Sequence, residues 1–195
     1  MRFCIEEHLR RGNADQVEAL AWQRFVQQPG SDPYFELIKV AKRIDRADDL
    51  ATKALQHLWQ RVRAEEAPSA KRLPSWQPPI RSALVAIHLR QKQAAKAWEA
   101  FCGGPVDMCV WDKVAAMRGK THPDEAVTLY KRLLPYVVTN GTRGADYREA
   151  FEIVQAIQGL RATQQQDALF KQELDELRST WKAKRNFIKL LAALG

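Results

Sequence analysis

The feature that most constrains this chain is a helical spacing of apolar residues that recurs from one end to the other. It is clear in residues 123–139, where the apolar positions are Ala126, Val127, Tyr130, Leu133, Leu134, Val137 and Val138. Residues three and four apart share one face of an α-helix. No stretch alternates apolar and polar residues convincingly, as a half-buried strand does. The sequence therefore predicts an all-α protein.

Glycine, proline and polar clusters divide this pattern into about eleven short helices. Their expected ranges are about 2–11, 15–28, a third starting at Ser31 or Asp32, then 47–64, 80–91, 94–101, 106–118, 123–139, 146–160, 165–182 and 186–194. Residues 65–79 contain four prolines and no periodicity, and form the longest expected connection. Pro135 falls inside an expected helix, which it should kink because it removes one backbone hydrogen bond.

Several helices begin with a similar phrase, which indicates internal repeats. "NADQVEALAWQRF" starts at Asn13, "RADDLATKALQHL" at Arg46, "KQAAKAWEAF" at Lys92 and "HPDEAVTLYKRLL" at His122. Each combines a polar start, small residues and then a large apolar side chain, as closely packed helix pairs require. The first two are offset by about 33 positions, near the ~34-residue tetratricopeptide period. We expect one domain over 1–195, a right-handed α-solenoid of degenerate tetratricopeptide-like helical hairpins.

The last residues, "RSTWKAKRNFIKLLAALG", are predicted to close this stack. Trp181 continues a seam with Phe170, Leu174 and Leu177, so we expect it to pack inward. The apolar residues after it would cover the open end, as terminal repeats must; they are Phe187, Ile188, Leu190, Leu191 and Leu194. Asn186 is the expected N-cap of this final helix.

Three phrases near the C-terminus carry a more specific resemblance. "HPDEAVTLYKRLLPYV", "ADYREAFEIVQAI" and "FKQEL…KAKRNFIKLL" occur in this order, and they resemble the C-terminal helical region of bacterial SWIM zinc finger family proteins. The resemblance implies a tetratricopeptide-like interaction module at the C-terminus of a larger bacterial protein. In that family a Cys-x-Cys…Cys-x-His zinc module precedes the helices. This chain has no such pattern, so no zinc ligand is carried over.

Composition is that of a folded protein without a membrane span. Apolar residues make up 46% and charged residues 28% of the chain, and no window approaches the ~20 apolar residues that a spanning helix needs. The N-terminus lacks the apolar core of a signal peptide. Cys4, Cys102 and Cys109 are widely spaced and odd in number, so we expect a cytoplasmic location and buried, unpaired thiols.

No motif commits the chain to catalysis or to a cofactor. A zinc site from Cys102, Cys109, His88 and His122 would use suitable ligand types, but the two cysteines lack the short spacing of a structural site. Paired carboxylates such as Glu65 and Glu66 are adjacent, and neighbours on a helix do not face each other. The glycines of "CGGPVD" and "NGTRGAD" are expected in loops that cap helices. We therefore expect no enzyme, no cofactor and no metal.

The predicted function is recognition of a protein partner, and nucleic-acid binding through a basic face is the alternative. Net charge is +8, with no acid between Glu66 and Glu99 or from Arg178 to Lys189, and positive charge on one face is enough for phosphate contact. Neither the partner nor the oligomeric state follows from the sequence. The candidate contacts for either partner are Trp76, Arg81, Arg90, Lys92, Lys96, Lys182, Lys184 and Arg185.

Overall fold

A computed structural model describes residues 2–68, 74, 77–141 and 146–194. These residues form α-helices and short 3₁₀ helices joined by turns, and no strand occurs among them. The prediction of an all-α protein is confirmed. The contacts divide the chain into two compact units, Met1–Asp107 and Met108–Gly195, which are described separately below.

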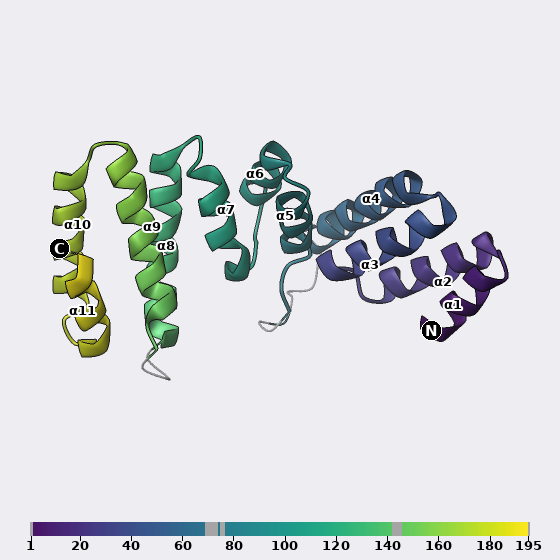
Figure 1. The fold of residues 1–195 in the computed structure, drawn as a ribbon, viewed down its shortest axis with the longest axis horizontal. Helices are drawn as coiled ribbons and strands as arrows, with labels where there is room; N and C mark the ends of the chain where they lie inside the picture. Colours follow the sequence, from purple (N-terminus) through teal and green to yellow (C-terminus); the bar gives the residue numbers. More distant parts are fainter. Residues whose placement is uncertain (1, 69–73, 75–76, 142–145, 195) are drawn as a thin grey trace. The chain divides into compact units, whose positions relative to one another are not determined.

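Unit 1 contains six α-helices and one 3₁₀ helix within its described residues (Figure 1). They are α1 (Arg2–Arg10), α2 (Ala14–Gln27), α3 (Ser31–Ala41), η1 (Lys42–Ile44), α4 (Ala47–Glu65), α5 (Arg81–Arg90) and α6 (Ala94–Cys102). Each α-helix packs against the next one in sequence, and α3 also contacts α5. Large side chains such as Phe25, Tyr34, Leu58 and Ile87 are fully buried between them.

The turns of unit 1 show how the sequence separates these helices. Gly12 follows α1 with φ +72°, the left-handed conformation that glycine adopts without cost, as its position after the first helix predicts. Asp45 and Lys92 also have positive φ, so the turns before α4 and α6 use non-glycine residues in this region. Lys92 is therefore part of a tight turn as well as a surface cation.

Unit 2 contains five α-helices and two 3₁₀ helices within its described residues. They are η2 (Met108–Val110), α7 (Trp111–Arg118), α8 (Pro123–Gly141), α9 (Arg148–Thr163), α10 (Asp167–Thr180), α11 (Arg185–Leu191) and η3 (Ala192–Leu194). Sequential helices from α7 to α11 pack together, and α11 also contacts α9 (Figure 1). The predicted apolar face of α8 is buried. Phe187 and Leu191 of α11 are fully buried too, and the Phe187 ring lies 5.6 Å from that of Tyr147.

Several helix starts differ from the predicted ones. The predicted helix 106–118 begins as the 3₁₀ helix η2 at Met108 and is α-helical only from Trp111. The Asp107 N–H, just before it, donates to Ser82 Oγ of α5 at 2.8 Å. Helix α11 begins at Arg185, so Lys184 is its N-cap and Asn186 lies in its first turn. Gly30, rather than Ser31 or Asp32, precedes α3. Helix α8 continues through Pro135, which is exposed there.

The prediction of buried cysteines is wrong. Cys4, Cys102 and Cys109 are all exposed. Two of them adjoin buried residues, Phe101 and Val110, but consecutive helical positions diverge by about 100°, so the neighbour of a core residue can face solvent. None of the described helices combines the length and the apolarity needed to cross a membrane.

Candidate interaction groove

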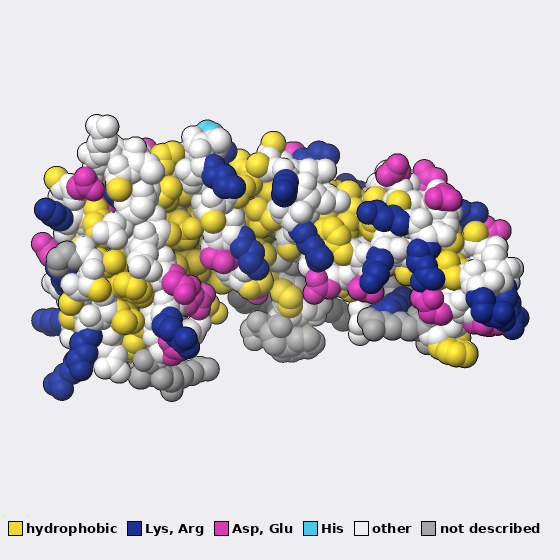
Figure 2. Space-filling view, in the orientation of Figure 1, with side chains coloured by type: hydrophobic (Ala, Val, Ile, Leu, Met, Phe, Trp, Pro, Cys, Tyr) yellow, Lys and Arg dark blue, Asp and Glu magenta, His cyan; other side chains and the backbone are white. Residues whose placement is uncertain are grey.

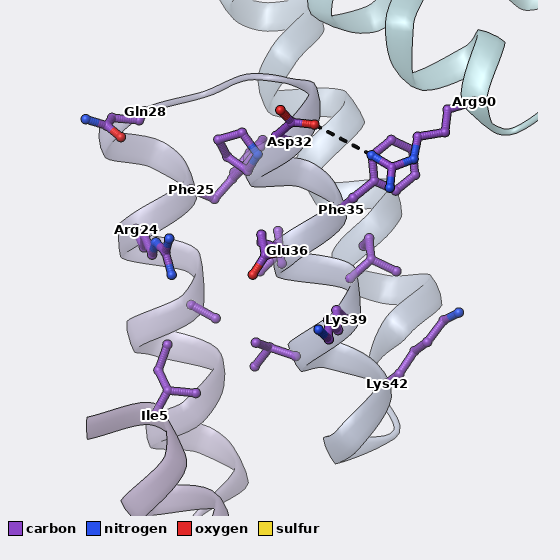
Figure 3. A pocket seen from close by; sticks show the side chains of 15 residues that line it. Ile5, Arg24, Phe25, Gln28, Asp32, Phe35, Glu36, Lys39, Lys42 and Arg90 are labelled. Carbon is purple, nitrogen blue, oxygen red and sulfur yellow. Dashed lines mark ion pairs between the residues drawn. The ribbon is translucent and has the colours of Figure 1, made fainter. Parts of the chain in front are cut away.

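Unit 1 carries a groove of about 740 Å³ on the side where α3 runs beside α2. Its walls come mainly from these two helices, with Ile5 of α1, Lys42 of η1 and Arg90 of α5 at its margins (Figure 3). The buried side chains Ala21, Phe25 and Leu37 are part of its lining. A concave site of this volume falls within the range of ligand-binding pockets.

The groove exists because α3 is apolar on more than one face. Tyr34, Leu37 and Ala41 are buried and form its core-facing stripe. Phe35, Ile38 and Val40 are only half-buried, and all three line the groove. A helix that buried one stripe alone would place polar residues at these positions. The surplus apolar surface of α3 is therefore the main feature of the site.

Tyr34 attaches α3 to the end of α5. Its hydroxyl accepts a hydrogen bond from Gln91 Nε2 at 3.0 Å, and burial raises the pKa of Tyr34. This contact keeps α3 in place beneath Arg90. The α3 wall of the groove is thus packed against α5.

Arg90 closes one end of the groove. Its Nη1 lies 3.6 Å from Asp32 Oδ1, and its guanidinium carbon lies 4.0 Å from the centre of the Phe35 ring (Figure 3). Both members of the ion pair are largely exposed, so the pair itself contributes little stability. The stacking on Phe35 holds the Arg90 side chain over apolar surface.

The remaining cations of the groove have a different environment. Arg24 of α2, Lys39 of α3 and Lys42 of η1 line it, and Figure 3 shows Arg24 and Lys39 on facing helices, with Glu36 near them. Among the described residues, none of the three cations has a side-chain hydrogen bond or an ion pair within 4 Å. The acidic residues of the lining are Asp32 and Glu36.

Arg81 does not fit the predicted role of a surface contact. It is buried, and its Nε and Nη2 donate to the two carboxylate oxygens of Glu66 at 2.7 and 2.6 Å. Its Nη1 donates to the Ala100 carbonyl at 3.3 Å, and its guanidinium lies over the Trp59 ring. Arg81 thus connects the ends of α4 and α6 to the start of α5, and it has no surface to offer a partner.

The glycine pair after α6 accommodates this arginine. A Cβ on Gly103 would lie 2.6 Å from Arg81 Nη1. A Cβ on Gly104 would lie 2.7 Å from Glu66 Oε1 and 2.8 Å from Arg81 Nε. Gly103 is the C-cap of α6, as predicted for this glycine pair, and both glycines also leave room for the ion pair.

The other predicted contacts do not form one site. Trp76 lies outside the described residues. In unit 1, Arg90 lies at the end of the groove, and Lys92 and Lys96 are exposed on the α5–α6 turn and on α6. In unit 2, Lys182 and Arg185 are exposed and Lys184 is half-buried, all around the α10–α11 turn. In Figure 2, basic and acidic side chains are interspersed on the visible surface of each unit.

Sequence reasoning missed Arg24, Phe35, Lys39 and Lys42 as candidates. The signal available was the composition of α3, where Phe35 and Val40 fall off the predicted stripe of Tyr34, Leu37, Ile38, Ala41 and Ile44. Five positions apart, Phe35 and Val40 lie about 140° apart around α3, on either side of its buried stripe. Apolar residues beyond the core-facing stripe indicate a further contact surface. Only the packing of α3 against other helices shows which of them this surface faces.

Unit 2 has a smaller groove of about 240 Å³ among α8, α9 and α10, beside a buried ion network. Arg161 Nη2 donates to Glu173 Oε1 at 2.8 Å, and Lys131 Nζ donates to the same oxygen at 2.8 Å. Asp124 also pairs with Arg161 at 3.0 Å. Burial alone would raise the pKa of Glu173, but the hydrogen bonds from Arg161 and Lys131 outweigh it and lower that pKa. The network joins α8, α9 and α10.

The structure does not bring together the histidines and cysteines that were considered as zinc ligands. Within the described ranges, no group of three or more His, Cys, Asp or Glu side chains is arranged to hold a metal. His88 is buried with its Nδ1 2.9 Å from Gln93 Oε1, and burial lowers its pKa. His122 is exposed, and its Nδ1 lies 2.8 Å from Thr121 Oγ1. These contacts position turns and helix ends.

Comparisons with known proteins give no relative. No family model, no curated protein and no solved structure matches this chain. The resemblance to the SWIM zinc finger family therefore stays a prediction, and the function has to be argued from the groove and its chemistry.

Proposed function

We propose that this chain is a non-enzymatic, tetratricopeptide-like interaction module that binds a segment of a partner protein in the α2–α3 groove. The observation that carries the proposal is the partly exposed apolar surface of Phe35, Ile38 and Val40 in a concave site. Such surface, framed by charged side chains, is typical of protein-binding sites. Its setting would be a bacterial cytoplasm, as the C-terminal module of a SWIM-family protein.

The repeat phrases support this proposal. Small residues at Ala21, Ala54, Ala97 and Ala126 are buried, as expected where paired helices approach closely. A right-handed solenoid closed by α11 would present such a groove to a peptide, since repeat arrays commonly bind partners along exposed helix faces.

The nucleic-acid alternative has less support. Of its candidate cations, Arg81 is buried and paired, while Lys96 and Lys182 belong to different units. Binding driven by phosphates should weaken steeply between low and moderate salt. Failure of the chain to retain DNA or RNA at low ionic strength would exclude it.

The proposal is tested by locating where a partner touches the chain. A photo-cross-linking amino acid at Val40 should capture a partner protein, whereas the same group at exposed Leu169 should not. The captured protein is then purified, and its affinity for the intact chain is measured by calorimetry. Replacing Ile38 and Val40 by asparagine removes apolar contact without changing charge, and should weaken binding at least about tenfold.

The matched control is Leu169→Asn, which changes an exposed apolar residue outside the groove. It should bind the partner as the unaltered chain does. A partner that binds the Ile38→Asn, Val40→Asn chain at full affinity, while circular dichroism shows the fold intact, would exclude this groove as its site.

A further inference from the structure

We infer that the partner segment in the α2–α3 groove is acidic and amphipathic, with apolar side chains on Phe35, Ile38 and Val40 and carboxylates opposite Arg24, Lys39 and Lys42. This inference rests on the proposed function of the groove and adds the chemistry of its occupant. Its basis is the combination of surplus apolar surface with three cations that form no ion pair within 4 Å among the described residues, all in one concavity.

The charge argument comes from comparison within unit 1. Outside the groove, several arginines are matched by carboxylates: Arg10 and Arg11 pair with Glu7, Arg43 pairs with Glu6, and Arg46 pairs with Asp15 and Glu18. Arg61 and Arg63 of α4 have no ion pair among the described residues, and they lie on one helix rather than around a groove. Arg24, Lys39 and Lys42 make no such pair among the described residues. A partner that supplied carboxylates would be complementary in charge to these three cations.

The position of these cations matters more than their number. Arg24 and Lys39 lie in the last turns of α2 and α3, where the helix dipole already favours positive charge. The helix dipole does not explain why cations from α2, α3 and η1 all line the same groove. Their shared placement around an apolar surface is what indicates a ligand of opposite charge.

The apolar lining favours a peptide over a nucleic acid. Phosphates would satisfy the cations, but they would leave the exposed parts of Phe35, Ile38 and Val40 uncovered. An amphipathic helix laid along a groove uses both, with apolar anchors at helical spacing and charges beside them. The groove walls are themselves helices, so a third helix can pack its ridge between them.

The test uses the full chain and fluorescent peptides of about 14 residues, roughly four helical turns. One peptide carries leucines at helical spacing with glutamates beside them, and its matched partner has glutamine at every glutamate. Fluorescence anisotropy should show binding of the glutamate peptide about tenfold tighter than that of the glutamine peptide, and the difference should shrink as salt rises. A labelled oligothymidine serves as the anionic competitor.

Two variants assign this preference to residues. Replacing Arg24, Lys39 and Lys42 by glutamine should remove it, whereas Lys92→Gln with Lys96→Gln, which alters exposed cations outside the groove, should leave it unchanged. Circular dichroism confirms that each variant is folded.

The outcomes separate this inference from the proposed function. Equal binding of both peptides, weakened by Ile38→Asn and Val40→Asn, would overturn the acidic partner and keep the groove. Binding that none of the groove variants weakens would overturn both. Absence of peptide binding, or displacement of the glutamate peptide by oligothymidine from the groove, would overturn the acidic peptide as the occupant.

Discussion

Arg81 and Glu66 form a two-point ion pair in which the arginine is far more buried than its partner. The Arg81 side chain is 7% exposed and that of Glu66 is 30% exposed. Removal of the carboxylate would leave a guanidinium enclosed with the Ala100 carbonyl and Trp59 as its remaining partners. The pair connects α4, α5 and α6, so its loss affects the packing of three helices.

Glu66→Ala should therefore destabilise unit 1. We expect a loss of about 2 kcal/mol in the free energy of unfolding, below the usual cost of breaking a fully buried pair because water reaches Glu66. Urea denaturation at neutral pH measures it. Glu6→Ala, which breaks the exposed pair with Arg43, should have a much smaller effect. Equal effects of the two changes would contradict the role of burial.

Gly104→Ala should destabilise the same junction by about 1–3 kcal/mol, because its Cβ would overlap the ion pair. Gly159→Ala is the matched control: it lies on α9 with nothing within 4 Å of the added carbon, and it should stabilise the chain by about 0.5–1 kcal/mol. Denaturation of both variants gives the comparison. A neutral Gly104→Ala would show that Glu66 and Arg81 move aside freely.

The Arg161–Glu173 pair in unit 2 should show a pH dependence in acid. The pKa of Glu173 is lowered in the folded chain below its ordinary value of 4.5, so the unfolded chain takes up the proton first. The contribution of Glu173 is thus complete above about pH 4.5, and it is lost as the pH falls through the folded pKa.

Glu173→Gln should lower the free energy of unfolding by about 3 kcal/mol at neutral pH, and the difference from the unaltered chain should shrink in acid. Glu176→Gln, at an exposed position on the same helix, should have little effect. A deficit of Glu173→Gln that stayed constant down to pH 3 would contradict the lowered pKa.

His88 should make unit 1 less stable as the pH falls below neutrality. Burial lowers its pKa from 6.5, so the unfolded chain binds a proton that the folded chain resists, and stability rises with pH across this window. The pKa of His57 is lowered too, by burial and by Arg61. Thermal unfolding between pH 5 and 7.5 should therefore show a smaller slope for His88→Gln, with a residual slope from His57. The same slope in both chains would exclude this role of His88.

Local pattern predicted much of this fold because helical periodicity depends on near neighbours. The face of α8 and the left-handed turn at Gly12 agree with the prediction. The start of the helix after residue 106 does not, since η2 begins at Met108 and α7 only at Trp111. The bond from the Asp107 N–H to Ser82 Oγ spans 25 positions of sequence, so local pattern could not predict it. The exposure of Cys102 and Cys109 was missed because each adjoins a core residue, and the helical neighbour of a core residue can face solvent.

The candidate site shows the same division. Charge counting selected Arg81 and Lys92 from one acid-free stretch, but it could not distinguish a buried, paired guanidinium from a surface cation. It passed over Arg24 and Lys39, which belong to separate helices with acids close in sequence. The sequence by itself determined an all-α chain and the helices it contains, because hydrogen bonds and apolar spacing within a helix are local. Only the tertiary structure decided that α2 and α3 lie side by side, which gathers Arg24, Lys39 and half-buried apolar residues of α3 into one groove. Burial and charge pairing depend on distances between residues far apart in the chain.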